Sequence, residues 1–139
     1  MAGHWQIQTL SGRMSSPHLK IALMHHPFNW FNPAEDPTIH HEMSNNFDFF
    51  LHGHEHLGWV EEINGGYKRI SAGACYGDSE EEMGYNVTRL TFDRNGNYSG
   101  KVWLRKYDRT GEGWVIRPVH GKAEDGVWVI RKGLEPPAL

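Results

Sequence analysis

Two short apolar runs that each end in histidines constrain this chain more than any other feature. Residues 20–24 lead into His25, and residues 47–52 lead into residues 53–56, which read Gly-His-Glu-His. Between them, residues 36–46 begin with Asp-Pro, a pair typical of a helix start, and we predict a short helix there. The order strand, helix, strand predicts a βαβ-like unit with a parallel strand pair.

The remainder of the chain is predicted to be rich in β-structure. The runs at 59–63 and 67–70 flank Asn-Gly-Gly at residues 64–66, which indicates a hairpin. Four further β runs follow, at residues 85–92, 98–107, 114–116 and 127–130. We therefore expect an α/β fold that is predominantly β, with a short βαβ-like N-terminal part followed by a mostly antiparallel sheet.

Length and charge limit the classes of protein to consider. A chain of 139 residues suits one domain, and we expect residues 1–139 to form it, with residues 1–18 and 132–139 poorly ordered. The net charge is −3, with both signs interspersed, which argues against nucleic-acid binding.

Targeting and cysteine content favour a cytoplasmic protein. The sequence contains no apolar run of about 18 residues, so we expect no membrane span. The first residues lack the charged-then-apolar order of a signal peptide. The one cysteine, Cys75, excludes an intrachain disulfide and fits a reducing compartment; we expect it to be small, buried and unreactive.

The histidines at the two strand ends suggest metal binding. In an extended chain His54 and His56 would lie on one face, about 6.5–7 Å apart. If the two runs are neighbouring parallel strands, His25 lies at the same edge of the sheet. Three imidazoles and one open position suit zinc, iron or manganese, and such an ion polarises a phosphoryl oxygen and lowers the pKa of bound water toward about 7.

Neighbouring side chains have plainer interpretations. His26 either packs beside Pro27 or orients a ligand, with packing favoured. His52 is interpreted as a strand-end residue with a backbone hydrogen bond. Glu55 points away from the histidines if the segment is extended, and is expected to face solvent.

The two histidine motifs carry a family resemblance. The string Leu-Met-His-His-Pro at residues 23–27, followed by residues 53–56, resembles the last two metal motifs of the calcineurin-like metallophosphoesterases. This superfamily includes purple acid phosphatases and class III cyclic-nucleotide phosphodiesterases. The resemblance covers roughly residues 18–107. It implies a two-sheet α/β/β/α sandwich, hydrolysis of phosphomonoesters or phosphodiesters, and His25, His54 and His56 as ligands of a divalent metal (manganese, zinc or iron).

The sequence also departs from the family pattern. The family's Asp-x-His, bridging Gly-Asp and Gly-Asn-His motifs do not precede residue 25, and the dipeptide at residues 77–78 lies downstream, in a predicted loop. Every carboxylate ligand of the family's site is therefore missing. The chain resembles the C-terminal half of the sandwich, a partial fold that we expect to be inactive or incomplete alone, with catalytic residues unknown.

Three functional alternatives remain open at this point. The chain is a metal-dependent phosphoesterase completed by a second chain or a missing N-terminal half, and acts on a phosphoester. Alternatively, it is a non-catalytic, oligomeric interaction module that binds a single metal. The third alternative is a folded remnant without activity. Because a half-sandwich exposes strand edges, we expect a homo-oligomer or a partner chain to cover them.

Overall fold

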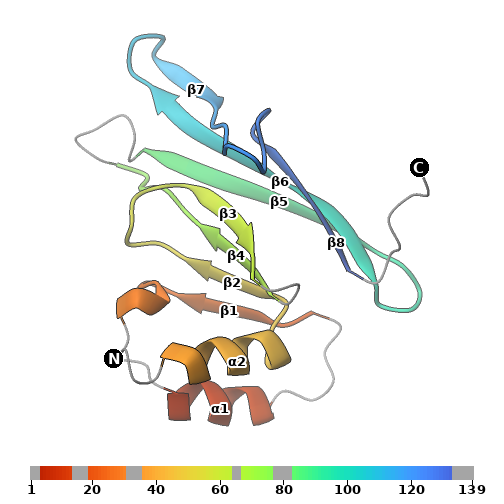
Figure 1. The fold of residues 1–139 in the computed structure, drawn as a ribbon. Helices are drawn as coiled ribbons and strands as arrows, with labels where there is room; N and C mark the ends of the chain where they lie inside the picture. Colours follow the sequence, from red (N-terminus) through yellow and green to blue (C-terminus); the bar gives the residue numbers. More distant parts are fainter. Residues whose placement is uncertain (1–3, 14–18, 31–35, 64–66, 77–82, 133–139) are drawn as a thin grey trace.

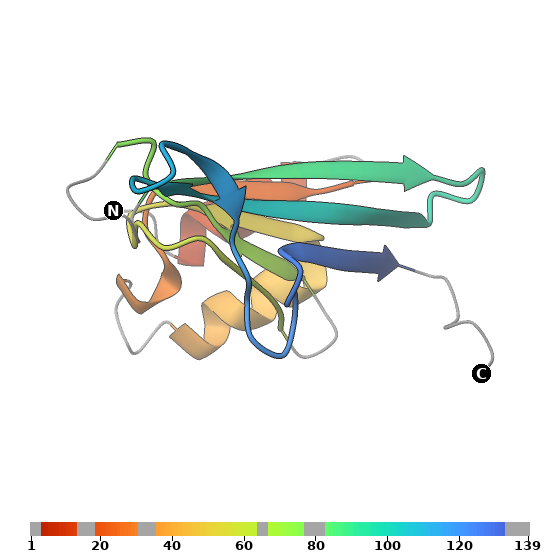
Figure 2. The same ribbon diagram turned by 90° about the horizontal axis from the view of Figure 1, so that it is seen from above.

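The protein is built in three layers. The computed structural model describes residues 4–13, 19–30, 36–63, 67–76 and 83–132. Two helices cover one face of a first sheet, and a second sheet packs on its other face (Figure 1). Seen from above the second sheet, no described helix lies over its outer face (Figure 2). The predicted α/β, predominantly β fold is confirmed, as one side of a sandwich covered by helices.

The first sheet contains the predicted βαβ unit. Its four strands are β1 (Ile21–Met24), β2 (Phe49–His52), β3 (Trp59–Glu62) and β4 (Lys68–Ser71), in the spatial order β1-β2-β4-β3. β1 and β2 are parallel and are connected through η1 (Phe28–Trp30) and α2 (Asp36–Asn46). β4 is parallel to β2, while β3 and β4 form the predicted antiparallel pair, whose connection at residues 64–66 lies outside the described residues.

The second sheet is antiparallel and is organised around one long strand. Its strands are β5 (Gly84–Phe92), β6 (Tyr98–Asp108), β7 (Gly113–Ile116) and β8 (Val127–Lys132). β6 pairs with β5 along one side and with β7 and β8 along the other. The expected antiparallel part of the fold is therefore confirmed, and β6 is its centre.

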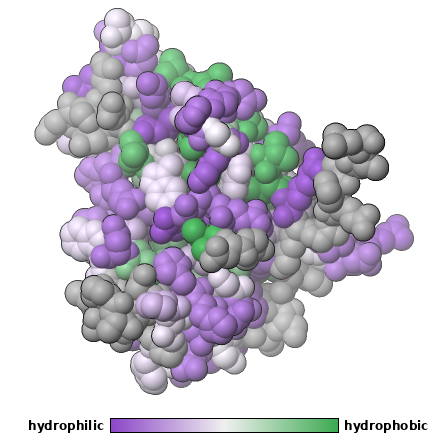
Figure 3. All heavy atoms as spheres, in the orientation of Figure 1, coloured by the Kyte–Doolittle hydropathy of each residue, from purple (hydrophilic) through white to green (hydrophobic). Residues whose placement is uncertain are grey.

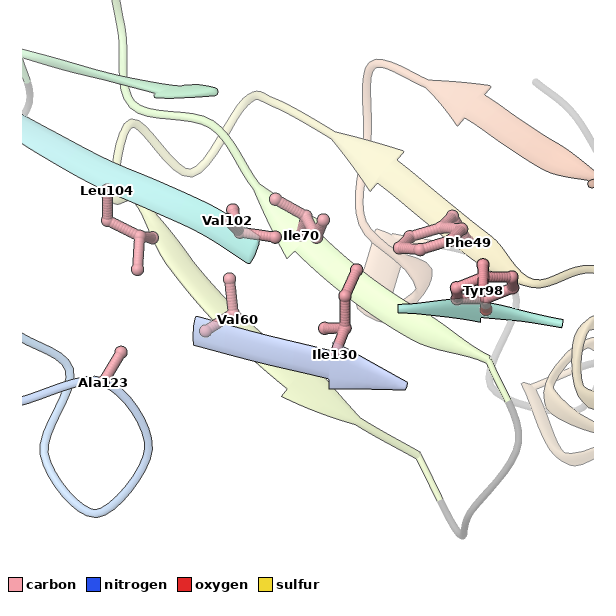
Figure 4. Close-up of a cluster of buried hydrophobic side chains, with 8 residues drawn as sticks. All are labelled: Phe49, Val60, Ile70, Tyr98, Val102, Leu104, Ala123 and Ile130. Atoms are coloured by element: carbon pink, nitrogen blue, oxygen red, sulfur yellow. The ribbon is translucent and has the colours of Figure 1, made fainter. Parts of the chain in front are cut away.

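The main core lies between the two sheets. Alternate residues of β6, Tyr98, Val102 and Leu104, are buried, whereas Trp103 points to the opposite face, as the period-two pattern predicted. Inward side chains of both sheets and one residue of the β7–β8 connection complete this core (Figure 4): Phe49, Val60, Ile70 and Ile130 from strands, and Ala123 from the connection. Each sheet thus needs the other to bury its apolar face.

A second core lies beneath the first sheet, against the helices. It contains Ile7, Phe28, Ile39, Met43, Phe50 and Tyr67. β2 contributes Phe49 to the upper core and Phe50 to the lower one, which explains why its sequence is a continuous apolar run.

One helix was missed from the sequence. α1 (His4–Arg13) lies within the segment expected to be poorly ordered, and it packs beside α2. It buries Ile7 and Ser11 but leaves Trp5 and Leu10 exposed, so its apolar residues do not form one stripe. The tertiary contact, rather than the pattern, accounts for this helix.

Cys75 is exposed, and the prediction that it is buried is therefore wrong. The residue lies in a bend after β4 rather than in the sheet.

The longest described helix has 11 residues. None of the helices in the described part of the chain is long and apolar enough to cross a membrane.

The sandwich is open along one side. Within the described residues, β1 pairs only with β2 and β5 only with β6. On β1, Ile21 and Leu23 are 47% and 79% exposed although they share a face with the core residue Phe49. The surface in Figure 3 is mostly polar, and apolar residues emerge on it in separate patches. The exposed apolar side chains of β1 are consistent with a partial sandwich.

Candidate metal centre

The strand register brings the histidines of both motifs to one edge of the first sheet. β1 and β2 are paired so that Met24 lies opposite His52, and both strands end there. Immediately beyond, the Gly53 N–H donates to the carbonyl oxygen of His25 at 3.2 Å. This hydrogen bond fixes the two segments side by side, as the parallel-strand prediction required.

Three imidazoles converge at this edge. His25 Nε2 lies 3.3 Å from His54 Nδ1, and the ring centroids of His26 and His54 are 4.5 Å apart. One potential ligand atom from each of His25, His26 and His54 can be chosen so that all three lie within 4.8 Å of one another. The rings are accessible to solvent, because His25 and His26 are exposed and His54 is half-buried.

His56, the third residue in the predicted ligand set, lies outside this cluster. The chain does not continue as a strand after His52: His54 and His56 have φ angles of 66° and 55°, and the Glu55 N–H donates to the Gly53 carbonyl oxygen at 2.8 Å. The assumption of extended backbone over residues 53–56 is therefore wrong. A tight turn separates the two histidines, so the alternation argument does not apply to them.

His26 takes part in the cluster instead, although its sequence position favoured packing. β1 ends at Met24, so the alternation of side chains no longer separates His25 from His26. The indole of Trp30 in η1 closes one side of the group, with its centroid 4.2 Å from that of His54 and 5.0 Å from that of His26. The end of the predicted strand, one residue before the His-His pair, was the signal that could have placed both residues at the site.

Buried aromatic rings position this loop. Phe28, at the start of η1, is 1% exposed and stacks on Phe50 of β2 with a centroid distance of 4.1 Å and an interplanar angle of 7°. The loop that carries His25 and His26 is thereby anchored to the strand that leads to His54.

His52 and Glu55 support the turn without joining the cluster. His52 is buried, and its Nδ1–H donates to the carbonyl oxygen of Gly53 at 3.1 Å, as expected for a strand-end residue. Burial lowers the pKa of His52 from 6.5, although this hydrogen bond opposes the shift. Glu55 is exposed and accepts a hydrogen bond from the Trp59 indole N–H at 3.0 Å, so its carboxylate is directed toward β3.

The electrostatics of the cluster favour neutral imidazole. Loss of hydration lowers the pKa of His54 from 6.5, and the charges that His26, His25 and His56 carry when protonated lower it further. Glu55 acts in the opposite direction. A neutral ring keeps a nitrogen lone pair available for a metal ion at neutral pH.

The donor set suits one transition-metal ion. Zinc–nitrogen bonds of about 2.0–2.1 Å in a tetrahedral site place ligand nitrogens about 3.3 Å apart. The ligand atoms of the three imidazoles lie within 4.8 Å of one another, so the widest pair has to close by up to about 1.5 Å to reach this spacing. Among the described residues, no carboxylate belongs to the group. The arrangement therefore matches one ion with an open position rather than a bridged pair.

Comparison with known proteins gives a weak structural likeness. No family model matches the sequence, and no curated protein matches it. Among solved structures, the chain is similar to a double mutant of Vps29 from Entamoeba histolytica, with a TM-score of 0.45 and 14% identity over 88% of this chain and 59% of that one.

Two related structures give the same result. A single mutant of the same protein matches with a TM-score of 0.45 and 15% identity over 88% of this chain and 59% of that one. Its wild type in complex with zinc matches with a TM-score of 0.43 and 17% identity over 86% of this chain and 57% of that one. The chain thus spans less than 60% of the length of these Vps29 structures.

Proposed function

We propose that the chain is a metallophosphoesterase-like module that binds one divalent metal ion and does not hydrolyse phosphoesters by itself. The convergence of His25, His26 and His54 at the ends of β1 and β2 is the observation that carries this proposal. His25 and His54 are common to the sequence prediction and the observed cluster. His26 is the third ligand in this proposal, and His56 is the alternative that the family resemblance predicts.

The donor set defines the chemistry that the site offers. Three neutral imidazoles select zinc, manganese, iron or a similar ion over calcium or magnesium, which prefer oxygen ligands. Such an ion acts as a Lewis acid toward a phosphoryl oxygen when it is bound. The residues of this chain hold the ion, and Trp30 limits access from one side.

Hydrolysis requires more than these residues supply. A two-metal phosphoesterase holds its ions about 3.5–4 Å apart, and a bridging carboxylate is the usual means. The group of metal-ligating side chains found in the described residues contains only imidazoles. We therefore assign binding, rather than catalysis, to the isolated chain, and a second chain that supplies carboxylates remains the route to activity.

Metal titration tests the proposal. Zinc added to chelator-treated protein is expected to bind near one equivalent in calorimetry, and His25→Ala and His54→Ala are each expected to weaken binding at least about tenfold. Comparison of His26→Ala with His56→Ala identifies the third ligand. His41→Ala is the matched control, because His41 is an exposed histidine on α2 whose ring contacts Asn45.

Two outcomes would overturn this assignment. Equal zinc affinity for His54→Ala and His41→Ala would contradict the proposed metal site. Hydrolysis of p-nitrophenyl phosphate by the isolated chain with manganese, lost in His54→Ala, would replace a binding module with an enzyme.

Self-association is a second candidate role, favoured by the open edge of β5. This strand has nine residues, of which only Arg89 is charged, and Val87 is 51% exposed. Natural sheets protect such edges with charges, prolines or bulges. The Gly84 N–H already donates to the Ala74 carbonyl oxygen at 2.9 Å, so the free edge of β5 begins at Tyr85. In an antiparallel pair of two β5 strands centred on Thr88, Val87 lies opposite Arg89 of the second copy and Tyr85 opposite Thr91. No like charges face each other in this register.

This register makes the test specific. Val87→Lys would place a cation opposite Arg89 of the second copy, whereas Val87→Glu would place a carboxylate there. Light scattering is expected to show a dimer for the parent chain and for Val87→Glu, and a monomer for Val87→Lys. A monomeric parent chain at high micromolar concentration, or equal dimerisation of the two variants, would reject the β5 pairing.

A further inference from the structure

The outer face of the second sheet contains a cationic hollow. Arg89, Lys101 and Arg131 line a recess of about 380 Å³ together with Thr91, Ser99 and Trp103. These residues belong to β5, β6 and β8 and all point away from the core. No described helix covers this face (Figure 2). The recess is therefore open to a ligand. It lies on the outer face of the second sheet, whereas the histidine cluster lies at an edge of the first sheet.

The register places like charges directly opposite each other. Arg89 is the cross-strand partner of Lys101, and Arg131 is the partner of Ser99. Directly opposed residues on a sheet have Cβ atoms about 4.5–5.5 Å apart, and like charges at this spacing are destabilising. The fold retains this pair although the chain as a whole has a net charge of −3.

Two cations of the first sheet are compensated by acidic neighbours. Arg69 forms an ion pair with Glu61, and Lys68 lies 3.9 Å from a carboxylate oxygen of Glu62. In contrast, none of the described residues that line the hollow is acidic. The outward positions of β5 and β6 include Arg105 as a further cation, and none of those outward positions that the structure describes is Asp or Glu. Among the described residues, this face therefore gathers four cations without an acidic neighbour on it.

We propose that this hollow binds a phosphorylated side chain of a partner protein. A phosphate monoester carries a charge of about −1.5 to −2 and three acceptor oxygens, whereas a carboxylate carries one charge on two oxygens. Three cationic side chains and the hydroxyls of Thr91 and Ser99 supply enough donors for the phosphate. The charge repulsion between Arg89 and Lys101 is relieved when this group binds.

The surroundings of the hollow favour a peptide as the source of the phosphate. Val87 and Val129 are exposed by 51% and 52% on this same outer face, and they offer apolar contacts to the residues next to a phosphorylated side chain. A recess of about 380 Å³ has room for a single side chain. Four cations on one face do not form the extended track that a nucleic-acid backbone needs.

Fluorescence anisotropy with a labelled peptide that contains one phosphoserine flanked by valines tests this proposal. The measurements use the full chain with a chelator present, so that the histidine cluster holds no metal. The phosphopeptide is expected to bind, and Lys101→Gln to weaken binding about tenfold, since a charge-assisted hydrogen bond is lost. Arg94→Gln is the matched control, because Arg94 is an exposed cation in the β5–β6 turn, outside the hollow. It is expected to leave binding unchanged.

Comparisons with other ligands decide the identity of the ligand. An unphosphorylated copy of the peptide is expected not to bind, and inorganic phosphate is expected to compete only at much higher concentration. Equal binding of both peptides, or equal losses in Lys101→Gln and Arg94→Gln, would overturn the proposal. Binding to phosphatidylserine vesicles or to a single-stranded oligonucleotide without binding to the phosphopeptide would also overturn it, in favour of a membrane or nucleic-acid surface.

Discussion

Replacement of Phe28 by leucine is expected to weaken metal binding, although Phe28 is not one of the proposed metal ligands. Phe28 is 1% exposed and stacks on Phe50 at 4.1 Å between centroids. It begins the 3₁₀ turn that follows the His-His pair and ends at Trp30. Loss of this ring frees the loop that carries His25 and His26, and the cluster then has to be ordered when the metal binds.

The cost in stability can be estimated from the packing. An aromatic pair contributes about 0.5–1.5 kcal/mol beyond its buried area, and the space that leucine leaves unfilled adds a cavity cost. We expect Phe28→Leu to lower the free energy of unfolding by about 1–3 kcal/mol. Domains of this kind have about 5–15 kcal/mol in total, so the variant remains folded.

The matched control is Phe49→Leu. Phe49 is 2% exposed, precedes Phe50 on the same strand and packs against Tyr98 in the core between the sheets. Urea unfolding is expected to show similar losses for both variants, whereas zinc calorimetry is expected to show weaker binding only for Phe28→Leu. Parallel losses of affinity in both variants, or an unchanged affinity in Phe28→Leu, would refute the role assigned to the loop anchor.

Two further predictions concern the second sheet and the pH dependence of stability. Gly100→Ala is expected to cost about 1–3 kcal/mol, because its Cβ would collide with the Arg89 carbonyl oxygen and lie 2.7 Å from Leu90 Cδ2. Gly12→Ala, in α1 with no neighbour within 4 Å of the added Cβ, is expected to preserve or raise stability in the same urea titration. The lowered pKa of His52 means that the unfolded chain binds its proton first as the pH falls below 6.5. Stability is expected to be fully present above pH 6.5 and to decline from there toward the folded-state pKa, with a shallower decline in His52→Phe.

The βαβ unit was predictable because three independent signals agree there. An apolar run marks each of its two strands, and Asp-Pro marks the start of the helix between them. The alternation in β6 also predicted the inward side of Val102 and Leu104 and the outward side of Trp103. The local sequence pattern was sufficient in these places, because alternation along a strand decides which face of the sheet each side chain takes.

Other features depend on contacts that the sequence does not encode locally. α1 is held by packing on α2, although two of its large apolar side chains face solvent. The position of His56 outside the cluster follows from left-handed backbone at His54 and His56. Non-glycine residues adopt this conformation seldom, and periodicity arguments assume that they do not. The displacement of His56 therefore comes from this turn, whereas the placement of His26 comes from the end of β1 at Met24.

The proposed metal binding and the proposed self-association involve neighbouring parts of the open side. Leu23 of β1 and Thr88 of β5 line a single groove of about 300 Å³ between the sheets, and this groove also contacts His52 and Gly53 at the base of the histidine turn. A partner or second copy that fills this groove would contact His52 and Gly53, directly before His54. If both proposals hold, an occupant that orders this turn raises the metal affinity, and by thermodynamic linkage the metal raises the affinity for the occupant by the same factor. The proposed metal site and the proposed assembly surface are therefore expected to be coupled.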